Sequence, residues 1–170
     1  MMARPTIALA AVAEGFELKQ TVSNHLRNVG YGVVDLGCYA AAGFVMYPSV
    51  GERLAYALSN GQAELGVICC SYGSSVCAAV AKFQGVCAFA SESVRTAEMC
   101  RRLNGANVLC VGQAIVDAEL ACEMVSAFAN AAFLDMEGLP EEVYDFHREA
   151  RDRLMARGEP PRTRDLEILE

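Results

Sequence analysis

The stretch Gly66–Lys82, GVICCSYGSSVCAAVAK, decides the fold of this chain. An apolar run ends in two cysteines, breaks into a small turn rich in Gly and Ser, and continues as an Ala-rich helical segment. This order predicts a strand, a turn with free backbone N–H groups and a helix start. In an open α/β sheet, ligands gather at the carboxyl ends of strands, and N–H groups at a helix start hold anions. We therefore expect Cys70 at the edge of an anion-binding hollow, where a thiol is a candidate base or nucleophile.

The neighbouring cysteine, Cys69, is expected in the core, because the pleat of a strand sends adjacent side chains to opposite faces. For Cys70, at the turn itself, a core role and a functional role are both open. Free cysteines usually behave as small buried apolar residues. We expect this of five others: Cys77, Cys87, Cys100, Cys110 and Cys122.

Composition excludes several classes of protein. The chain has 170 residues, of which 54% are hydrophobic, so one domain with one core is expected. No apolar run approaches the roughly 18 residues of a membrane span, residues 1–13 lack the order of a secretion signal, and the eight cysteines lie in apolar segments. A cytoplasmic location is therefore expected, without a membrane partner.

The net charge of −7 argues against nucleic acid as a partner. Without a Cys-x-x-Cys pair and with two histidines, neither a metal site nor a cofactor is expected.

Along the chain, apolar runs of strand type alternate with segments of helical period. The expected strands are Thr6–Ala11, Gly32–Leu36, Leu65–Cys70, Val86–Phe89 and Val108–Val111. The expected helices are Glu17–Asn28, Val50–Asn60, Ser75–Ala81, Ser93–Asn104 and Asp117–Ala129. This alternation predicts an α/β fold with a doubly wound, five-stranded, mostly parallel sheet of Rossmann-like type.

The C-terminal part differs in composition. Residues 1–135 are expected to form the single α/β domain, residues 136–158 a C-terminal helical segment, and residues 159–170 an extended tail. The helix, expected over 140–157, carries an apolar stripe that must pack against something. The stripe consists of Val143, Phe146, Ala150 and Leu154. We expect this helix at an interface, either with its own domain or with a neighbouring subunit.

Six motifs occur in a characteristic order and spacing. They are IALAAVAEGFELK from Ile7, GYGVVDLG from Gly30, Tyr47–Pro48, ICCSYGSSVCAAVAK from Ile68, RRLNGANVLCVG from Arg101 and AELACEMVSAF from Ala118. In this order they resemble the family of type B ribose-5-phosphate isomerases and galactose-6-phosphate isomerases, over about Thr6–Phe133. The resemblance implies that family's α/β fold, dimers or tetramers with sites built from two chains, and proton transfer between neighbouring carbons of sugar phosphates through an enediolate.

The resemblance also implies roles for individual residues. Cys70 falls at the position of the catalytic base in one branch of the family. The turn after it matches the family's Gly-Thr-Gly-Ile-Gly at Gly73 alone, and Tyr72 is expected to reshape the pocket or to cover it. The substrate contacts expected from the resemblance are Ser71, Tyr72, Gly73, Ser74, Ser75, Tyr47, Asn104, Arg148 and Arg151. The two arginines are expected to act across a subunit interface, and a solvated arginine face is the alternative.

The chain departs from the family where sugar contacts and ring opening are expected. Val12 and Ala13 stand in place of an Asp-His pair, and neither side chain can transfer a proton. Two later histidines are replaced by Glu92 and Leu103, and an arginine by Ala114. Three residues are candidates for a replacement acid: Glu14, Glu92 and Tyr72.

Three hypotheses about function follow. The first is an aldose–ketose isomerase that uses Cys70 as base on a small phosphorylated or open-chain sugar other than ribose 5-phosphate. The second is a non-catalytic or partner-dependent subunit that pairs with a paralogue. The third is covalent chemistry with Cys70 as nucleophile on the same fold. All three are compatible with a homodimer or homotetramer, and the second also with a hetero-oligomer.

Overall fold

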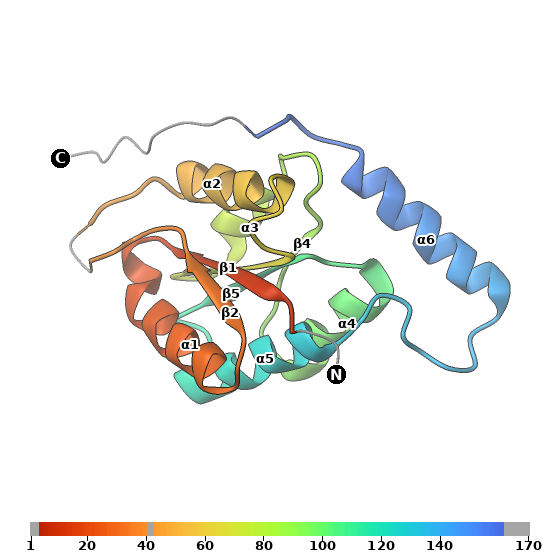
Figure 1. Ribbon diagram of the computed structural model, residues 1–170, viewed down its shortest axis with the longest axis horizontal. Helices are drawn as coiled ribbons and strands as arrows, with labels where there is room; N and C mark the ends of the chain where they lie inside the picture. The colour runs from red at the N-terminus through yellow and green to blue at the C-terminus, as the bar shows by residue number, and fades with distance from the viewer. Residues whose placement is uncertain (1–3, 41–42, 162–170) are drawn as a thin grey trace.

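The sheet of the computed structural model is fully parallel, and the structure describes residues 4–40 and 43–161. Its strands are β1 (Thr6–Ala11), β2 (Gly32–Asp35), β3 (Leu65–Cys70), β4 (Ala88–Ala90) and β5 (Val108–Gly112). Their order is β2-β1-β3-β5-β4, with β3 in the centre (Figure 1). The predicted doubly wound α/β sheet is confirmed.

Helices cover both faces of this sheet (Figure 1). They are α1 (Phe16–Asn28), α2 (Tyr47–Ser59), α3 (Ser74–Val80), α4 (Val94–Asn104), α5 (Ala118–Asn130) and α6 (Glu141–Met155), with the short 3-10 turn η1 (Ala13–Gly15). One core cluster joins α1, α4 and α5 to the sheet, and the other joins α2 and α3 to its opposite face. The strands are therefore apolar on both faces, as double cover requires.

Several boundaries differ from the prediction. The helix expected from Val50 begins at Tyr47, because Pro48 fits the first turn of a helix. The strand expected over Val86–Phe89 is Ala88–Ala90, since only these residues pair with β5. The turn η1 was not expected.

Alternation along β3 separates the two adjacent cysteines. Cys69 belongs to the core cluster beneath α1 and α5, whereas Cys70 belongs to the cluster beneath α2 and α3. The burial predicted for Cys69 is confirmed, because its side chain is fully buried. Cys70 ends the strand on the opposite face, directly before the turn that leads into α3.

The C-terminal helix lies at one side of the molecule, where it contacts α4 (Figure 1). None of its residues is buried. The segment after it is tied down by backbone hydrogen bonds, from Gln84 N–H to Glu159 O and from Glu159 N–H to Lys82 O. Of the expected tail, residues 162–170 lie outside the described residues. Within the described ranges, no helix combines the length and apolarity needed to cross a membrane.

Candidate functional site

Cys70 ends β3. It lies at the carboxyl edge, which here means the side of the sheet where the carboxyl ends of all the parallel strands lie. The turn after Cys70 holds its side chain. The Gly73 N–H donates a hydrogen bond to Cys70 Sγ at 2.9 Å. Gly73 has a φ of +80°, in the left-handed region that favours glycine, and it precedes the first residue of α3. Cys70 is buried in the core cluster beneath α2 and α3, with 5% of its surface exposed.

Residues at and just after the end of β5 hold this turn through backbone hydrogen bonds and a close backbone contact. The N–H groups of Gln113 and Ala114 donate to the carbonyls of Cys70 and Ser71, at 2.8 and 2.9 Å. Gly112 is pressed against Tyr72, because a Cβ there would lie 2.7 Å from the Tyr72 carbonyl carbon. Backbone contacts therefore fix the turn, whatever its side chains are.

The connection after β1 packs against the other side of Cys70. A Cβ on Gly15 would lie 2.3 Å from the Cys69 carbonyl carbon and 2.6 Å from the Cys70 nitrogen, so only glycine allows this approach. The Val12 N–H donates to Cys69 O at 3.2 Å, and Val12 shares a core cluster with Cys70. The departure at Val12 thus falls beside the proposed base, whereas Ala13 packs against the core cluster on the other face of the sheet.

Tyr72 lies at the surface of the molecule. Its residue surface is 63% exposed, so the phenol extends into solvent rather than packing into the core. Ser74 and Ser75 are exposed beside it in the first turn of α3, and no side chain caps that helix. Their N–H groups have no intrahelical acceptor.

The other candidate acids and Tyr47 also lie at the carboxyl edge. Glu14 is exposed on η1, the turn that packs against the end of β3. Glu92 follows β4, which β5 separates from β3, so it is farther from Cys70 in the sheet order. Tyr47 begins α2 and is exposed. The connection from β2 to α2 carries three further exposed apolar or aromatic side chains: Tyr39, Phe44 and Met46.

Positive charge is scarce at this edge. The connections after the five strands, residues 12–15, 36–46, 71–73, 91–93 and 113–117, contain no Lys, Arg or His. Two cations approach this edge from helices, and neither was predicted as a site residue. Arg53 donates to Leu36 O, and burial lowers the pKa of its guanidinium. The only signal in the sequence that could have indicated Arg53 was a charged side chain within an apolar helical segment.

Lys19 is the second of these cations. Its side chain is 1% exposed, and its ammonium donates to both Asp35 carboxylate oxygens at 2.7 and 2.8 Å. It also donates to the carbonyls of Gly37 at 3.0 Å and Cys38 at 2.8 Å. Lys19 therefore fixes the start of the connection from β2 to α2 and has no free donor for a ligand.

Asn104 and the residue that Arg151 contacts, Gly105, lie before the start of β5, at the end of the sheet opposite to Cys70. Asn104 ends α4 before β5 begins, and Arg151 Nε donates to the carbonyl of the next residue, Gly105, at 3.4 Å. The Arg151 guanidinium stacks on the Phe133 ring, 5.1 Å from its centroid. Val108 and Gly112 mark the two ends of β5, roughly 13 Å apart at the usual rise per residue. Within one chain, Asn104 and Arg151 therefore do not reach Cys70.

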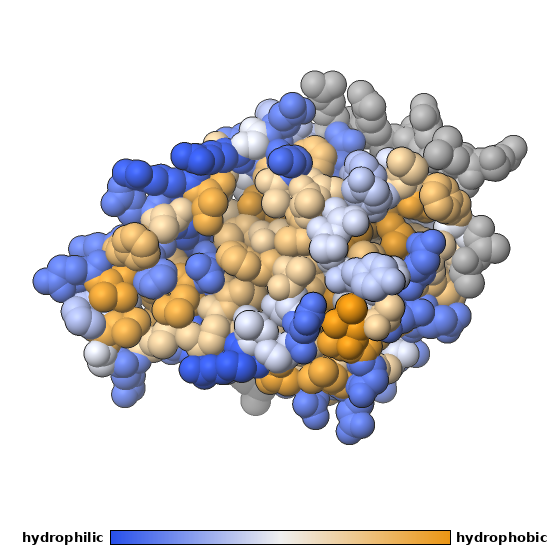
Figure 2. All heavy atoms as spheres, turned by 180° about the vertical axis from the view of Figure 1, so that it is seen from behind, coloured by the Kyte–Doolittle hydropathy of each residue, from blue (hydrophilic) through white to orange (hydrophobic). Residues whose placement is uncertain are grey.

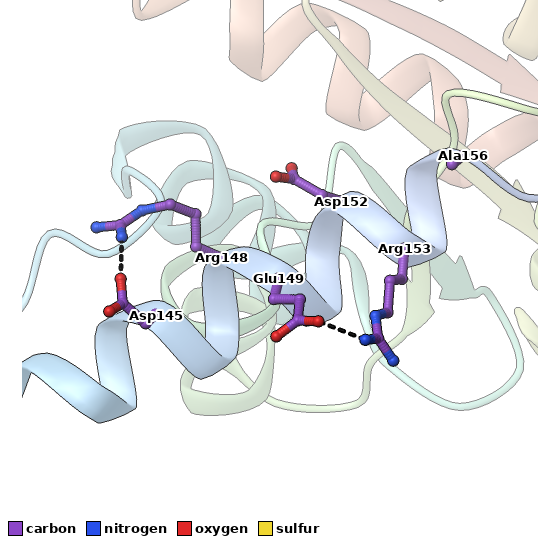
Figure 3. A pocket seen from close by; sticks show the side chains of 6 residues that line it. All are labelled: Asp145, Arg148, Glu149, Asp152, Arg153 and Ala156. Atoms are coloured by element: carbon purple, nitrogen blue, oxygen red, sulfur yellow. Dashed lines mark hydrogen bonds and ion pairs between the residues drawn. The ribbon is translucent and has the colours of Figure 1, made fainter.

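Arg148 lies on the outer face of α6 and pairs with Asp145 one turn earlier. A shallow recess runs along this face, and the residues that line it come from α6 and its C-cap (Figure 3). They are Asp145, Arg148, Glu149, Asp152, Arg153 and Ala156. The recess has no opposite wall in a single chain. In a single chain, Arg148 is therefore exposed to solvent. This was the alternative to a role across a subunit interface.

The other thiols are not all buried. Cys87, Cys100 and Cys110 are core residues as expected, but Cys77 and Cys122 are only half-buried. Burial raises the pKa of Cys69 to about 12 and that of Cys100 to about 11. Among the described residues, no three His, Cys, Asp or Glu side chains are grouped so that they could hold a metal ion.

Comparison with known proteins agrees with this architecture. A family model described as Ribose/Galactose Isomerase matches residues 7–142. The D-erythrulose-4-phosphate isomerase of Pectobacterium atrosepticum is 29% identical over 75% of this chain and 84% of its own length. The 4-deoxy-4-sulfo-D-erythrose isomerase of a Clostridium species is 29% identical over 88% of this chain and 93% of its own. The structure of the Clostridium thermocellum ribose-5-phosphate isomerase B is similar, with a TM-score of 0.77, 26% identity, and coverage of 87% of this chain and 96% of that one.

Proposed function

The chain belongs to the ribose/galactose isomerase family, and from that premise we propose that it interconverts an aldose and a ketose of a short, acyclic sugar carrying a terminal anionic group. Cys70 is the proposed base. The supporting observation is the position of its sulfur, at the carboxyl end of the central strand and in contact with the Gly73 N–H.

The reaction moves two protons, one between neighbouring carbons and one between their oxygens. The Cys70 thiolate removes the proton from the carbon next to the carbonyl, and the resulting enediolate carries negative charge on oxygen. The hydroxyl proton passes to the former carbonyl oxygen, and Cys70 returns its proton to the neighbouring carbon. N–H groups aimed at the developing charge stabilise it. The uncapped N–H groups of Ser74 and Ser75 lie in the same turn as the sulfur and are available for this role.

The side chains beside Cys70 favour an acyclic substrate. Val12 and Ala13 stand where the family resemblance implies a carboxylate and an imidazole that assist ring opening, and the turn formed with Gly15 packs on the Cys70 backbone. A four-carbon sugar whose fourth carbon carries phosphate or sulfonate has no hydroxyl there to close a five-membered ring. Such a substrate needs no ring-opening group. Two relatives bear the names of four-carbon substrates of this kind.

The anionic end of the substrate is proposed to lie against a second copy of the chain. The connections around Cys70 contain no cationic residue, whereas Asn104 and Arg151 lie together at the opposite edge. A symmetric dimer places that edge of one subunit against the Cys70 edge of the other. Residues 136–158, with the unburied α6, are then an interfacial element beside the α/β domain of residues 1–135.

The exposed apolar surface supports this assembly. Phe146 and Leu154 on α6 are exposed, as are Tyr72 and Ile115 at the carboxyl edge. Apolar surface also extends across the middle of the face in Figure 2, between polar margins. Exposed apolar surface of this kind marks interaction sites. We propose a homodimer, with Arg148 and the recess beside it at or near the interface.

Exchange of carbon-bound hydrogen with solvent tests the proposed reaction. The protein in D₂O is given D-erythrose 4-phosphate, D-erythrulose 4-phosphate or ribose 5-phosphate, and NMR follows product formation and deuterium at the carbon next to the carbonyl. We expect turnover and exchange with a four-carbon substrate, much slower turnover of ribose 5-phosphate, and loss of both in Cys70→Ala. Equal rates with Cys70→Ala would overturn the role of the sulfur.

Other outcomes select the remaining hypotheses. Turnover that appears only after a paralogous chain is added supports a partner-dependent subunit. A stoichiometric adduct on Cys70 with an electrophilic substrate analogue, without hydrogen exchange, supports nucleophilic chemistry.

A further inference from the structure

Gln113 is the first residue after β5, and its backbone is hydrogen-bonded directly to Cys70. In the register of β3 and β5, Cys70 pairs with Gly112, and the Gln113 N–H donates to Cys70 O at 2.8 Å. Gln113 therefore lies beside the proposed base at the carboxyl edge, where ligands of open α/β sheets bind. It was not predicted as a site residue from the sequence.

The side chain of Gln113 is held by a second hydrogen bond, from the N-terminus of α1. The Leu18 N–H, in the first turn of that helix, donates to Gln113 Oε1 at 2.9 Å. Of the two polar atoms of an amide side chain, only the oxygen accepts a hydrogen bond, so this contact fixes which way the amide faces. The Gln113 side chain thus has a defined orientation, although the residue is exposed.

The amide nitrogen of Gln113 is left without an acceptor. None of the described residues accepts a hydrogen bond from Nε2, which carries two N–H donors. The orientation of these donors is set in advance, because the backbone N–H and Oε1 are both already bonded. Donors that are fixed before the substrate arrives stabilise developing charge without a cost of reorganisation.

The thiol and the amide approach the end of β3 from different faces of the sheet. Cys70 belongs to the core cluster beneath α2 and α3, whereas the Gln113 amide is bonded to α1, which covers the opposite face. The end of β3 therefore lies between them. A small substrate that lies across this strand end meets the thiol from one side and the amide donor from the other.

We propose that Gln113 is a substrate-binding residue whose Nε2–H donates to an oxygen of the enediolate. This inference rests on the proposed isomerisation, and it adds a neutral donor at an edge whose connections carry no cationic side chain. The charge that forms on the substrate oxygen when Cys70 removes the proton strengthens this hydrogen bond. An interaction that is strongest in the transition state raises kcat rather than lowering KM.

The isosteric variant Gln113→Glu separates substrate binding from helix capping. Its carboxylate keeps an acceptor for the Leu18 N–H, and negative charge at a helix N-terminus is favourable, so urea unfolding should show equal or greater stability. The same carboxylate has lost the donor and repels the enediolate. With D-erythrose 4-phosphate or D-erythrulose 4-phosphate, we expect kcat to fall by about 10²-fold or more, the loss typical of one missing oxyanion donor, with little change in KM.

Gln62→Glu is the matched control for the added charge. Gln62 is also exposed, but it precedes β3, at the end of that strand opposite to Cys70. We expect the wild-type kcat from this variant. Gln113→Met, which removes the acceptor and the donor together, should lose both activity and some stability. A wild-type kcat in Gln113→Glu would overturn the proposal and leave Gln113 as a cap of α1 alone.

Binding of an enediolate mimic gives a measurement that does not need turnover. In 3-phospho-D-glycerohydroxamate, the two oxygens of the hydroxamate take the positions of the two enediolate oxygens of a four-carbon substrate, and calorimetry measures its Kd. We expect at least tenfold weaker binding to Gln113→Glu than to the wild type, and unchanged binding to Gln62→Glu. A wild-type protein that neither turns over a four-carbon sugar phosphate nor binds the mimic would refute the proposed function itself. Equal Kd values for an active wild type and Gln113→Glu would refute only the role of Gln113.

Discussion

The backbone N–H of Gly73 donates a hydrogen bond to Cys70 Sγ across 2.9 Å, from a residue with a φ of +80°. This geometry positions the sulfur by the shape of the turn rather than by a neighbouring side chain. The turn has lost the other glycines that the family resemblance implies, so Gly73 carries the left-handed conformation alone.

Gly73→Ala is therefore expected to remove catalysis at a modest cost in stability. A Cβ in the left-handed region costs about 1–2 kcal/mol, and misplacing a reacting atom by about 1 Å lowers the rate by about 10²-fold. Hydrogen exchange by NMR and urea unfolding measure the two effects.

Gly61→Ala is the control for this variant. Gly61 has a φ of +67° with open space around its Cβ position, and it precedes β3, at the opposite end of that strand from the Cys70 turn. We expect a similar loss of unfolding free energy with unchanged exchange. Equal activity in both variants would show that the Gly73 N–H is dispensable.

A site shared between two copies predicts complementation. Cys70→Ala and Asn104→Ala chains, each inactive alone, are co-expressed and assayed. Half of the randomly formed dimers are mixed, and each has one site built from two unaltered edges, so about a quarter of the wild-type activity should return. Co-expressed Cys70→Ala and Gly73→Ala chains, altered at the same edge, should recover none. Absence of recovery in the first mixture would place Asn104 outside the site.

The buried Lys19 predicts a large loss of stability. Lys19→Met leaves the Gly37 and Cys38 carbonyls without the Lys19 donor, and it leaves the Asp35 carboxylate with the Gly37 N–H at 3.3 Å and no cation. Removing one partner of a fully buried pair costs about 3–5 kcal/mol; Asp35 is 27% exposed, so we expect a loss of about 2–3 kcal/mol, which urea unfolding measures. Arg153→Met, which breaks an exposed pair with Glu149, should change the free energy by less than about 0.5 kcal/mol. A similar small change for Lys19→Met would contradict the anchoring role.

The pKa of Cys77 predicts the pH dependence of its alkylation. A thiol is alkylated as the thiolate, so a pKa lowered to about 7 makes the rate rise with pH around neutrality and level off above it. Cys122, whose pKa is raised by burial, should remain slow over the same range. In Cys110→Ala the Cys77 profile should move to higher pH, because the hydrogen bond that lowers its pKa is lost. Peptide-resolved iodoacetamide labelling measures each rate, and identical profiles with and without Cys110 would refute this cause.

Most of the fold could be predicted from the sequence. Apolar runs alternating with helical periods located all five strands, and the pleat placed Cys69 and Cys70 on opposite faces. The strand boundary was predicted wrongly where the local apolar pattern favours a strand but strand pairing in the folded protein does not include the same residues. The run at Val86 is apolar enough for a strand, but only residues from Ala88 onward reach β5.

The arrangement of the site came from the tertiary structure, because chain direction and strand order decide which residues meet. The motifs assign Cys70, Asn104 and Arg151 to one site, yet the residues before a parallel strand and those after it lie at opposite edges of the sheet. Strand pairing likewise brings Val12 beside Cys70 across 58 positions of sequence, and helix packing places Cys77 against the core cluster that contains Cys110. Sequence determined which chemical groups are present, through residue type and periodicity. The packing of β1, β5 and α3 around β3 determined which of those groups can act on the same atom.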